Sequence, residues 1–387
     1  MVMATTVIVG GGIIGVCTAY FLGQAGEDVI VVDRGELASG TSKQCNGSVA
    51  SGTEKLSAYA CRSNTLYARF AEESDLGFEY RRKGSFRLIG SEEKLHNVTA
   101  VLEKQRREGL VAQLISPEEL KRQEPKIDTS HILAAVDYPM DADMNPYLAV
   151  RVIAGAAERL GVRILRRTEV SGIRRDPGKG SFSIITAKGK ISARRIVNAA
   201  GVWAAAIGNM LGVRIPVVPL RGQVIVTEST EPLLDRKINE ADSIQLSITD
   251  GNRPVRLKVT SVLEPTPHHT CLIGRSEELV GYENRTTTQV IRALCTRAAS
   301  HVPAFTKVNI IRTYAGLRPV TPDGLPIISE IKEVPGLFVA TGHGGNGITL
   351  GPITGLLLSE MILGRPPSLP VGLFDLHRFS RANAESE

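Results

Sequence analysis

The 387-residue chain has few aromatic residues and no long run of basic residues. Aromatics make up 5%, and lysines and arginines stand singly or in short pairs, whereas nucleic-acid-binding surfaces cluster basic residues among aromatic ones. We therefore expect no nucleic-acid partner. The net charge of +6 indicates general solubility and a weak attraction for anionic small molecules.

Cysteines are also few, and none has a metal-ligand spacing. The five cysteines include no Cys-x-x-Cys pair and no cluster with histidine, so no metal site is expected. An odd number of widely spaced cysteines favours a reducing compartment, and we expect a cytoplasmic protein, at most peripheral to the inner membrane through partner subunits. The apolar stretch from Thr5 to Leu22 follows no Lys or Arg and is interrupted by three glycines, so no transmembrane segment is expected.

No collagen-like period or repeat at solenoid spacing is present, which excludes repeat architectures. What is present is the composition of a globular protein, with 42% hydrophobic and 22% charged residues. At roughly 150 residues per domain, the length predicts about two domains.

The first 33 residues predict a strand, a glycine turn, a helix and a second strand. The run Val7–Val9 leads into the turn at residues 10–15, a helix is predicted from Val16 to Ala25, and Val29–Val32 ends at Asp33.

The spacing Gly10-x-Gly12-x-x-Gly15 gives each glycine a physical role. Gly10 allows the tight turn, Gly12 lets a pyrophosphate approach the backbone, and Gly15 lets helix and strand pack closely. The helix N-terminus then faces the phosphates, and the Asp33 carboxylate can accept hydrogen bonds from ribose hydroxyls. The pattern predicts dinucleotide binding and does not by itself separate FAD from NAD.

Four segments together resemble one known family. Residues 10–42, GGGIIGVCTAYFLGQAGEDVIVVDRGELASGTS, are similar to the opening of FAD-dependent D-amino-acid-oxidase-type oxidoreductases, and residues 197–203, 316–328 and 337–349 resemble later parts of that family. The family includes glycine and sarcosine oxidases, D-amino-acid dehydrogenase and the β subunits of proline, hydroxyproline and opine dehydrogenases. The resemblance implies FAD as the cofactor.

It also implies an α/β (mixed α+β) fold, in which a Rossmann-like FAD-binding domain is interleaved with a substrate domain built on an antiparallel or mixed sheet. Residues 1–53, 140–222 and 312–387 would form the FAD-binding domain, and residues 54–139 and 223–311 the substrate domain.

Periodicity predicts the main elements around these motifs. The predicted helices are Glu92–Glu108, Pro117–Glu124, Asp141–Gly161 with Asn145-Pro146 as its start signal, and Leu350–Leu363; the predicted strands include Val162–Leu165, Glu169–Val170, Gln223–Thr227, Cys271–Gly274 and one before the turn at residue 342.

The resemblance assigns an FAD contact set to positions of this chain. Those residues are Gly10, Gly12, Ile13, Ile14, Gly15, Asp33, Arg34, Thr41, Ser42, Ser48, Val170, Ala200, Gly201, Trp203, Arg318, Gly344, Gly345, Asn346, Gly347, Ile348 and Thr349. We expect noncovalent FAD, because no cysteine follows Cys295 and the histidine nearest to the N-terminal flavin loop, His96, is too far along the chain. Cys45 is interpreted as a small apolar filler near the ring.

Arg318 is the candidate for binding the substrate carboxylate, since it matches the family's carboxylate-binding arginine and a guanidinium can donate two parallel hydrogen bonds. The alternative is a structural arginine that pairs with Asp323. Gly345 and Asn46 are the other candidate substrate contacts. His343 is a candidate catalytic base, or a turn residue whose backbone matters more than its ring.

The implied reaction is oxidation of a C–N bond of an amino or imino acid by hydride transfer from the α-carbon to flavin N5. The favoured substrate is a secondary amine such as proline, hydroxyproline or an opine, and the favoured form is the catalytic β subunit of a hetero-oligomeric dehydrogenase whose partner subunits carry flavin or iron–sulfur electron acceptors. Gly345-Asn346 stands where glycine oxidases carry an arginine, which disfavours glycine oxidase. A stand-alone, oxygen-using sarcosine, glycine or D-amino-acid oxidase and a non-catalytic flavin-bearing scaffold remain as alternatives.

Overall fold

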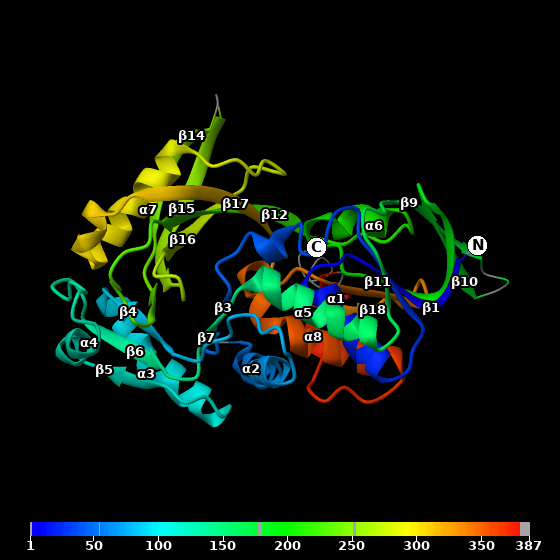
Figure 1. The fold of residues 1–387 in the computed structure, drawn as a ribbon, viewed down its shortest axis with the longest axis horizontal. Coiled ribbons are helices and arrows are strands. Elements are labelled where there is room, and N and C mark those ends of the chain that lie inside the picture. The colour runs from blue at the N-terminus through cyan, green and yellow to red at the C-terminus, as the bar shows by residue number, and fades with distance from the viewer. Residues whose placement is uncertain (1, 54, 177, 179, 251–252, 380–387) are drawn as a thin grey trace, which may run out of the picture.

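The computed structural model describes residues 2–53, 55–176, 178, 180–250 and 253–379. Two large sheets lie in separate halves of the molecule, and strands β12 and β17 extend between them (Figure 1). The chain passes repeatedly from one half to the other, which confirms the predicted interleaved α/β architecture.

The eight-stranded sheet carries the glycine turn and has the order β18-β19-β11-β1-β2-β8, with β10 and β9 joined antiparallel to β11. Its strands are β1 (Val2–Val9), β2 (Val29–Val32), β8 (Arg163–Leu165), β9 (Val170–Asp176), β10 (Ser181–Thr186), β11 (Gly189–Asn198), β18 (Ile327–Glu330) and β19 (Leu337–Thr341). β1, β2, β8, β11 and β19 pair in parallel. All four residues of β2 are fully buried, as is typical of a parallel strand covered on both faces.

Helices α1, α5 and α8 lie side by side along one face of this sheet (Figure 1). The helices of this half are α1 (Ile13–Gln24), α2 (Ser57–Glu72), α5 (Pro146–Arg159), α6 (Ala204–Asn209) and α8 (Gly347–Ile362). α2 shares the hydrophobic core with α1 and α8, although the predicted boundary at residue 54 would assign it to the substrate domain. The domain boundaries stay predictions.

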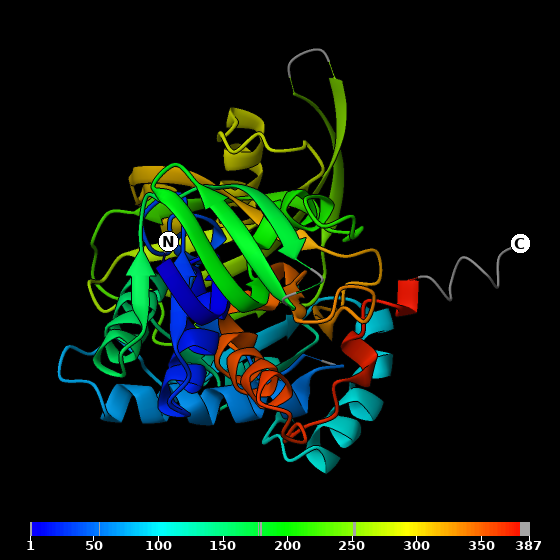
Figure 2. The same ribbon diagram turned by 90° about the vertical axis from the view of Figure 1, so that its right-hand side faces the viewer.

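The nine-stranded sheet has the order β17-β12-β16-β15-β13-β4-β6-β5, with β14 paired to β15. Its strands are β4 (Ser85–Ile89), β5 (Gln113–Ile115), β6 (Ala134–Tyr138), β12 (Val218–Thr227), β13 (Lys237–Glu240), β14 (Ile244–Asp250), β15 (Arg253–Pro265), β16 (Cys271–Glu278) and β17 (Ile310–Val320). α7 (Thr288–His301) packs on this sheet, and α3 (Glu92–Arg107) and α4 (Pro117–Gln123) lie beside β4–β6. The hairpin of β14 and β15 projects away from the body (Figure 2).

Short segments complete the chain between these elements. They are the two-stranded sheet β3 (Ser48–Val49) with β7 (Ala142–Asp143), and the 3-10 turns η1 (Thr41–Lys43), η2 (Gly201–Trp203), η3 (Pro303–Lys307), η4 (Gly344–Asn346) and η5 (Gly372–Phe374).

Several predicted element bounds are wrong by a few residues, each for a local reason. α1 begins at Ile13, three residues before the predicted start, because the helix follows Gly12 at once. The helix predicted from Asp141 begins at Pro146, since residues 142–143 pair with β3 and the Asn145 side chain accepts a hydrogen bond from the Leu148 N–H at 3.2 Å. α8 begins at Gly347 instead of Leu350. Among the residues described, no helix has the length and apolar character needed to cross a membrane.

Candidate active site

A cavity of about 1210 Å³ connects the glycine turn of the eight-stranded sheet with one face of the nine-stranded sheet. Its walls come from the ends of β1 and β2, the loop at residues 39–48, the start of α8, and strands β4, β6, β12 and β15–β17. Every residue of the predicted cofactor and substrate sets lines this cavity except Gly15.

The glycine turn leaves no space for side chains at two positions. Gly10 has φ +118°, and a Cβ there would lie 2.4 Å from the carbonyl oxygen of Ala199. A Cβ at Gly15 would lie 1.9 Å from the Gly10 carbonyl oxygen, which explains why Gly15 packs behind the cavity wall. The turn thus brings the N-terminus of α1 directly to the cavity, where free N–H groups and the helix dipole favour an anion.

Asp33 lies at the tip of β2 and is fixed by two backbone groups. Its carboxylate accepts hydrogen bonds from the N–H of Gly11 at 2.7 Å and of Gly35 at 2.8 Å. Next to it, the Arg34 guanidinium lies 3.9 Å from the ring centroid of Trp203, a cation–π contact that covers this end of the cavity. Both residues face the cavity, in the place expected for the nucleotide.

These residues fit FAD. The N-terminus of α1 at Gly12 would hold the pyrophosphate, Asp33 the ribose, and the start of α8 the edge of the ring where negative charge builds up. Bound FAD supplies the acceptor for two electrons. Cys45 lines the cavity, but burial raises the pKa of its thiol to about 12, so it is a neutral side chain there.

Arg318 lies within β17, on the cavity side of the nine-stranded sheet. Its Nη1 donates to the carbonyl oxygen of Ser276 at 2.7 Å, and its guanidinium lies against Gly222, where a Cβ would be 2.3 Å from Nη1. Burial, and then nearby Arg275, lower the pKa of Arg318 to about 10, so the guanidinium remains protonated at neutral pH. The alternative of a pair with Asp323 is wrong, because Asp323 accepts from Nε of Arg378 at 2.7 Å.

His343 is 3% exposed, and its Nε2 lies 3.0 Å from Oγ1 of Thr354 in α8. Burial lowers the pKa of His343 to about 3, so the imidazole is neutral and weakly basic. This geometry favours a structural role at the turn before α8 and argues against a catalytic base.

The same shift predicts a loss of stability in acid. Because the folded pKa of about 3 lies below the ordinary value of about 6.5, the unfolded chain binds a proton between these pH values that the folded chain does not. The free energy of unfolding therefore decreases as pH falls below about 6.5. At pH 5.5 His343 alone accounts for a decrease of about 1.4 kcal/mol. We expect His343→Gln to reduce the fall in Tm between pH 7.5 and 5.5 by about 2 °C. The exposed His96 offers the matched control, since His96→Gln should keep the wild-type fall.

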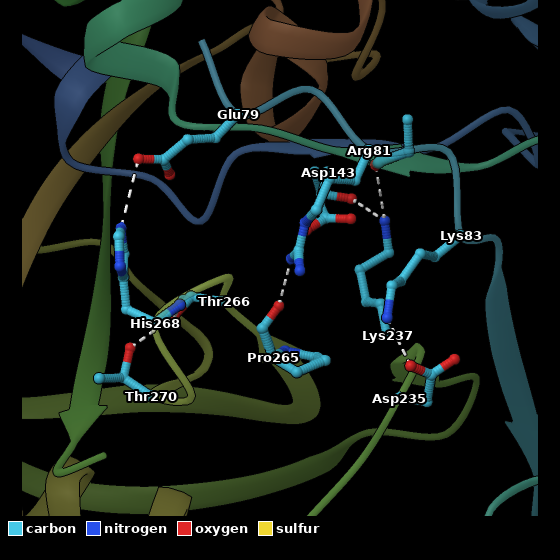
Figure 3. Close-up of polar contacts among 12 residues, drawn as sticks. Glu79, Arg81, Lys83, Asp143, Asp235, Lys237, Pro265, Thr266, His268 and Thr270 are labelled. Atoms are coloured by element: carbon cyan, nitrogen blue, oxygen red, sulfur yellow. Dashed lines mark hydrogen bonds and ion pairs between the residues drawn. The ribbon is translucent and has the colours of Figure 1, made fainter. Parts of the chain in front are cut away.

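Ser48 is held from outside the cavity by Lys237, a residue that sequence reasoning missed. The ammonium of Lys237 is buried and donates to Ser48 Oγ at 2.6 Å and to the Ala142 carbonyl oxygen at 3.3 Å. Close to Lys237, Arg81 donates to the Asp143 carboxylate and, at 2.7 Å, to the carbonyl oxygen of Pro265 (Figure 3). These contacts tie the two-stranded sheet of β3 and β7 to strands β13 and β15.

A group of charged residues beside Arg318 also has no recognisable pattern in the sequence. Arg275 of β16 and Lys258 of β15 stand in strands without any motif, and only the pairing of these strands brings them to the cavity, where both contact the carboxylate of Glu277.

Comparisons with known proteins agree with this geometry. A family model described as FAD dependent oxidoreductase matches residues 5–361. Glycine oxidase from Geobacillus kaustophilus is 28% identical and is matched over 96% of each chain. Hydrogen cyanide synthase subunit HcnC from Pseudomonas aeruginosa is 31% identical, over 83% of this chain and 73% of that protein. The crystal structure of L-proline dehydrogenase from P. horikoshii superposes with a TM-score of 0.89 at 28% identity, covering 98% of this chain and 99% of that one.

Proposed function

Because the chain belongs to the family of FAD-dependent oxidoreductases that oxidise amino and imino acids, we propose that its substrate is a secondary amino acid such as proline, hydroxyproline or an opine. We further propose that it works as the catalytic subunit of a hetero-oligomeric dehydrogenase. A partner subunit carrying flavin or an iron–sulfur cluster would then take the electrons.

The observation that carries the proposal is the position of Arg318. Its only hydrogen bond to the part of the chain described is the one to the Ser276 carbonyl oxygen, which leaves the rest of the guanidinium free to bind a ligand in the cavity. The same cavity extends to the glycine turn at residues 10–15. A carboxylate bound here is held beside the cofactor site, as the oxidation of an amino acid requires.

The relatives support the proposed substrate class and the proposed hetero-oligomer. The similarity to L-proline dehydrogenase favours a secondary amine, and the similarity to HcnC, a subunit of hydrogen cyanide synthase, favours a multi-subunit enzyme. All five cysteines are free thiols, which supports a cytoplasmic location. Any contact with the inner membrane would be made through partner subunits.

This chain's own residues have a binding and orienting role in the reaction. Arg318 holds the substrate carboxylate by two N–H groups and so fixes which face of the α-carbon is presented. Ser48, held by Lys237, and the start of α8 form other parts of the cavity wall.

An anaerobic titration of the FAD-loaded chain tests the proposal. Proline and hydroxyproline in both configurations, an opine, sarcosine, glycine and D-alanine are added in turn, and we expect a secondary amino acid to bleach the flavin absorbance. On admission of air, reoxidation should be slow, because the electrons are passed to a partner. Rapid reoxidation with oxygen consumption would indicate a stand-alone oxidase, and a bound flavin that none of these amines reduces would contradict the proposed activity.

A further inference from the structure

Four charged side chains gather beside the candidate substrate site, and three of them, Arg275, Lys258 and Arg318, line the cavity from strands β16, β15 and β17. Arg275 donates to Glu277 Oε1 from Nε at 3.0 Å and from Nη2 at 2.7 Å, and Lys258 Nζ lies 3.6 Å from Glu277 Oε2. Arg318 is near enough for its charge to affect this group. Burial and then Arg275 lower the pKa of Arg318, and the pKa of Glu277, which burial alone would raise, is lowered by Arg275, then Lys258, then Arg318.

The group carries three positive charges and one negative charge. Glu277 is shared by Arg275 and Lys258, and no carboxylate among the described residues forms an ion pair with Arg318. The local net charge is therefore +2. An unbalanced charge is costly for the buried guanidinium of Arg318, whereas Arg275 and Lys258 are about half exposed. A substrate with one carboxylate can balance only one of these two charges.

The second positive side chain is placed to reach a ligand held by Arg318. Arg275 lies on β16, two strands from β17, which corresponds to about 10 Å between the backbones. The Arg275 side chain is 47% exposed, and its Nη1 has no hydrogen-bond partner among the described residues. Arg275 and Lys258 both line the cavity.

The strand that carries Arg275 is firmly placed. Behind it, Glu278 accepts from Arg221 of β12 at 2.8 Å and from Nε2 of Gln223 at 2.9 Å, and the side chains of Arg221 and Glu278 are fully buried. This pair joins β16 to β12, the strand between Arg275 and Arg318. The spacing of the two strands that carry Arg275 and Arg318 is thus set by the sheet.

We propose that the substrate is a dicarboxylate, a secondary amine whose nitrogen links two carboxylate-bearing arms, with one carboxylate bound by Arg318 and the other by Arg275 together with Lys258. The inference rests on the proposed function and narrows its substrate class from secondary amino acids to those with a second carboxylate.

Two inert ligands of the FAD-loaded chain test the inference without turnover. Glutarate has the chain length of iminodiacetate and butyrate that of sarcosine, so the pair differs only by the second carboxylate. Binding is followed by the change in the flavin spectrum. We expect glutarate to bind at least about tenfold more tightly than butyrate, and Arg275→Gln to remove that preference while the affinity for butyrate stays within about twofold.

Controls separate charge from folding. Arg275→Lys keeps the positive charge and should keep part of the preference for glutarate. Arg312→Gln removes an exposed charge of β17 that lies away from the cavity, and it should leave the affinity for both ligands unchanged. In turnover, wild-type kcat/KM should favour iminodiacetate over sarcosine, and Arg275→Gln should remove this difference. Equal affinities for glutarate and butyrate in the wild type, or an equal loss of both in Arg275→Gln, would overturn the inference.

The outcomes also distinguish the inference from the proposed function. If proline or sarcosine reduces the flavin while glutarate shows no advantage, the function stands and the second carboxylate site is wrong. If glutarate binds preferentially through Arg275 but no secondary amine reduces the flavin, the dianion site stands and the proposed reaction is wrong.

Discussion

Arg318→Ala is expected to lower kcat/KM for the amino acid that reduces the flavin by about 30- to 5,000-fold. Removing one member of a partly buried charge pair costs about 2–5 kcal/mol, because the substrate carboxylate enters the cavity without its partner. The measurement is anaerobic stopped-flow reduction of the flavin over a range of substrate concentrations. Folding should change little, since the side chain donates one hydrogen bond, to a carbonyl oxygen beside the cavity.

Two companion variants show whether the geometry or only the charge matters. Arg318→Lys keeps the charge but cannot form two parallel hydrogen bonds, so it should recover only part of the loss. Arg312→Ala truncates an arginine of the same strand that is exposed and lies away from the cavity, and it should behave as the wild type. Normal saturation kinetics in Arg318→Ala would remove Arg318 from the substrate site.

The nucleotide-binding half was predictable because its signals are local. Strand, turn and helix at residues 7–24 follow one another directly, and the roles of Gly10 and Gly15 depend on neighbours in that same unit. Asp33 could be placed at the cavity because a parallel strand must end beside the preceding turn. Such features need no knowledge of distant contacts.

The substrate half was predictable only in part, because its contacts join strands far apart in sequence. The strand order β17-β12-β16 brings Arg275 to the same cavity as Arg318, and Lys237 donates to Ser48 across 189 residues of chain. Neither residue has a spacing that marks it. Asp323 near Arg318 was a reasonable partner by sequence, but the chain beyond α8 brings Arg378 to it instead.

Loss of the Asp33 carboxylate is expected to weaken FAD retention by about 10- to 150-fold. In Asp33→Ala the N–H groups of Gly11 and Gly35 lose their acceptor, and the ribose hydroxyls lose the carboxylate to which they would donate. A hydrogen bond to a charged group is worth about 1.5–3 kcal/mol. The flavin-to-protein ratio after gel filtration and the Kd for FAD measured by flavin fluorescence check this. Asp28→Ala is the matched control in the same strand–helix–strand unit, because Asp28 is half exposed and pairs with Arg163 at 2.7 Å.

Asp33→Asn separates the two roles of this carboxylate. Asn keeps one side-chain oxygen, which can accept from Gly11 or from Gly35 but carries no charge. If the charge toward the ribose dominates, Asn should lose nearly as much affinity for FAD as Ala does. If anchoring the two loops dominates, Asn should recover a large part, and the Tm of the FAD-free chain should rise with it. Unchanged flavin occupancy in both variants would contradict the assignment of Asp33 to the cofactor site, and the acceptor for the ribose would then have to be sought among the other residues around Arg34.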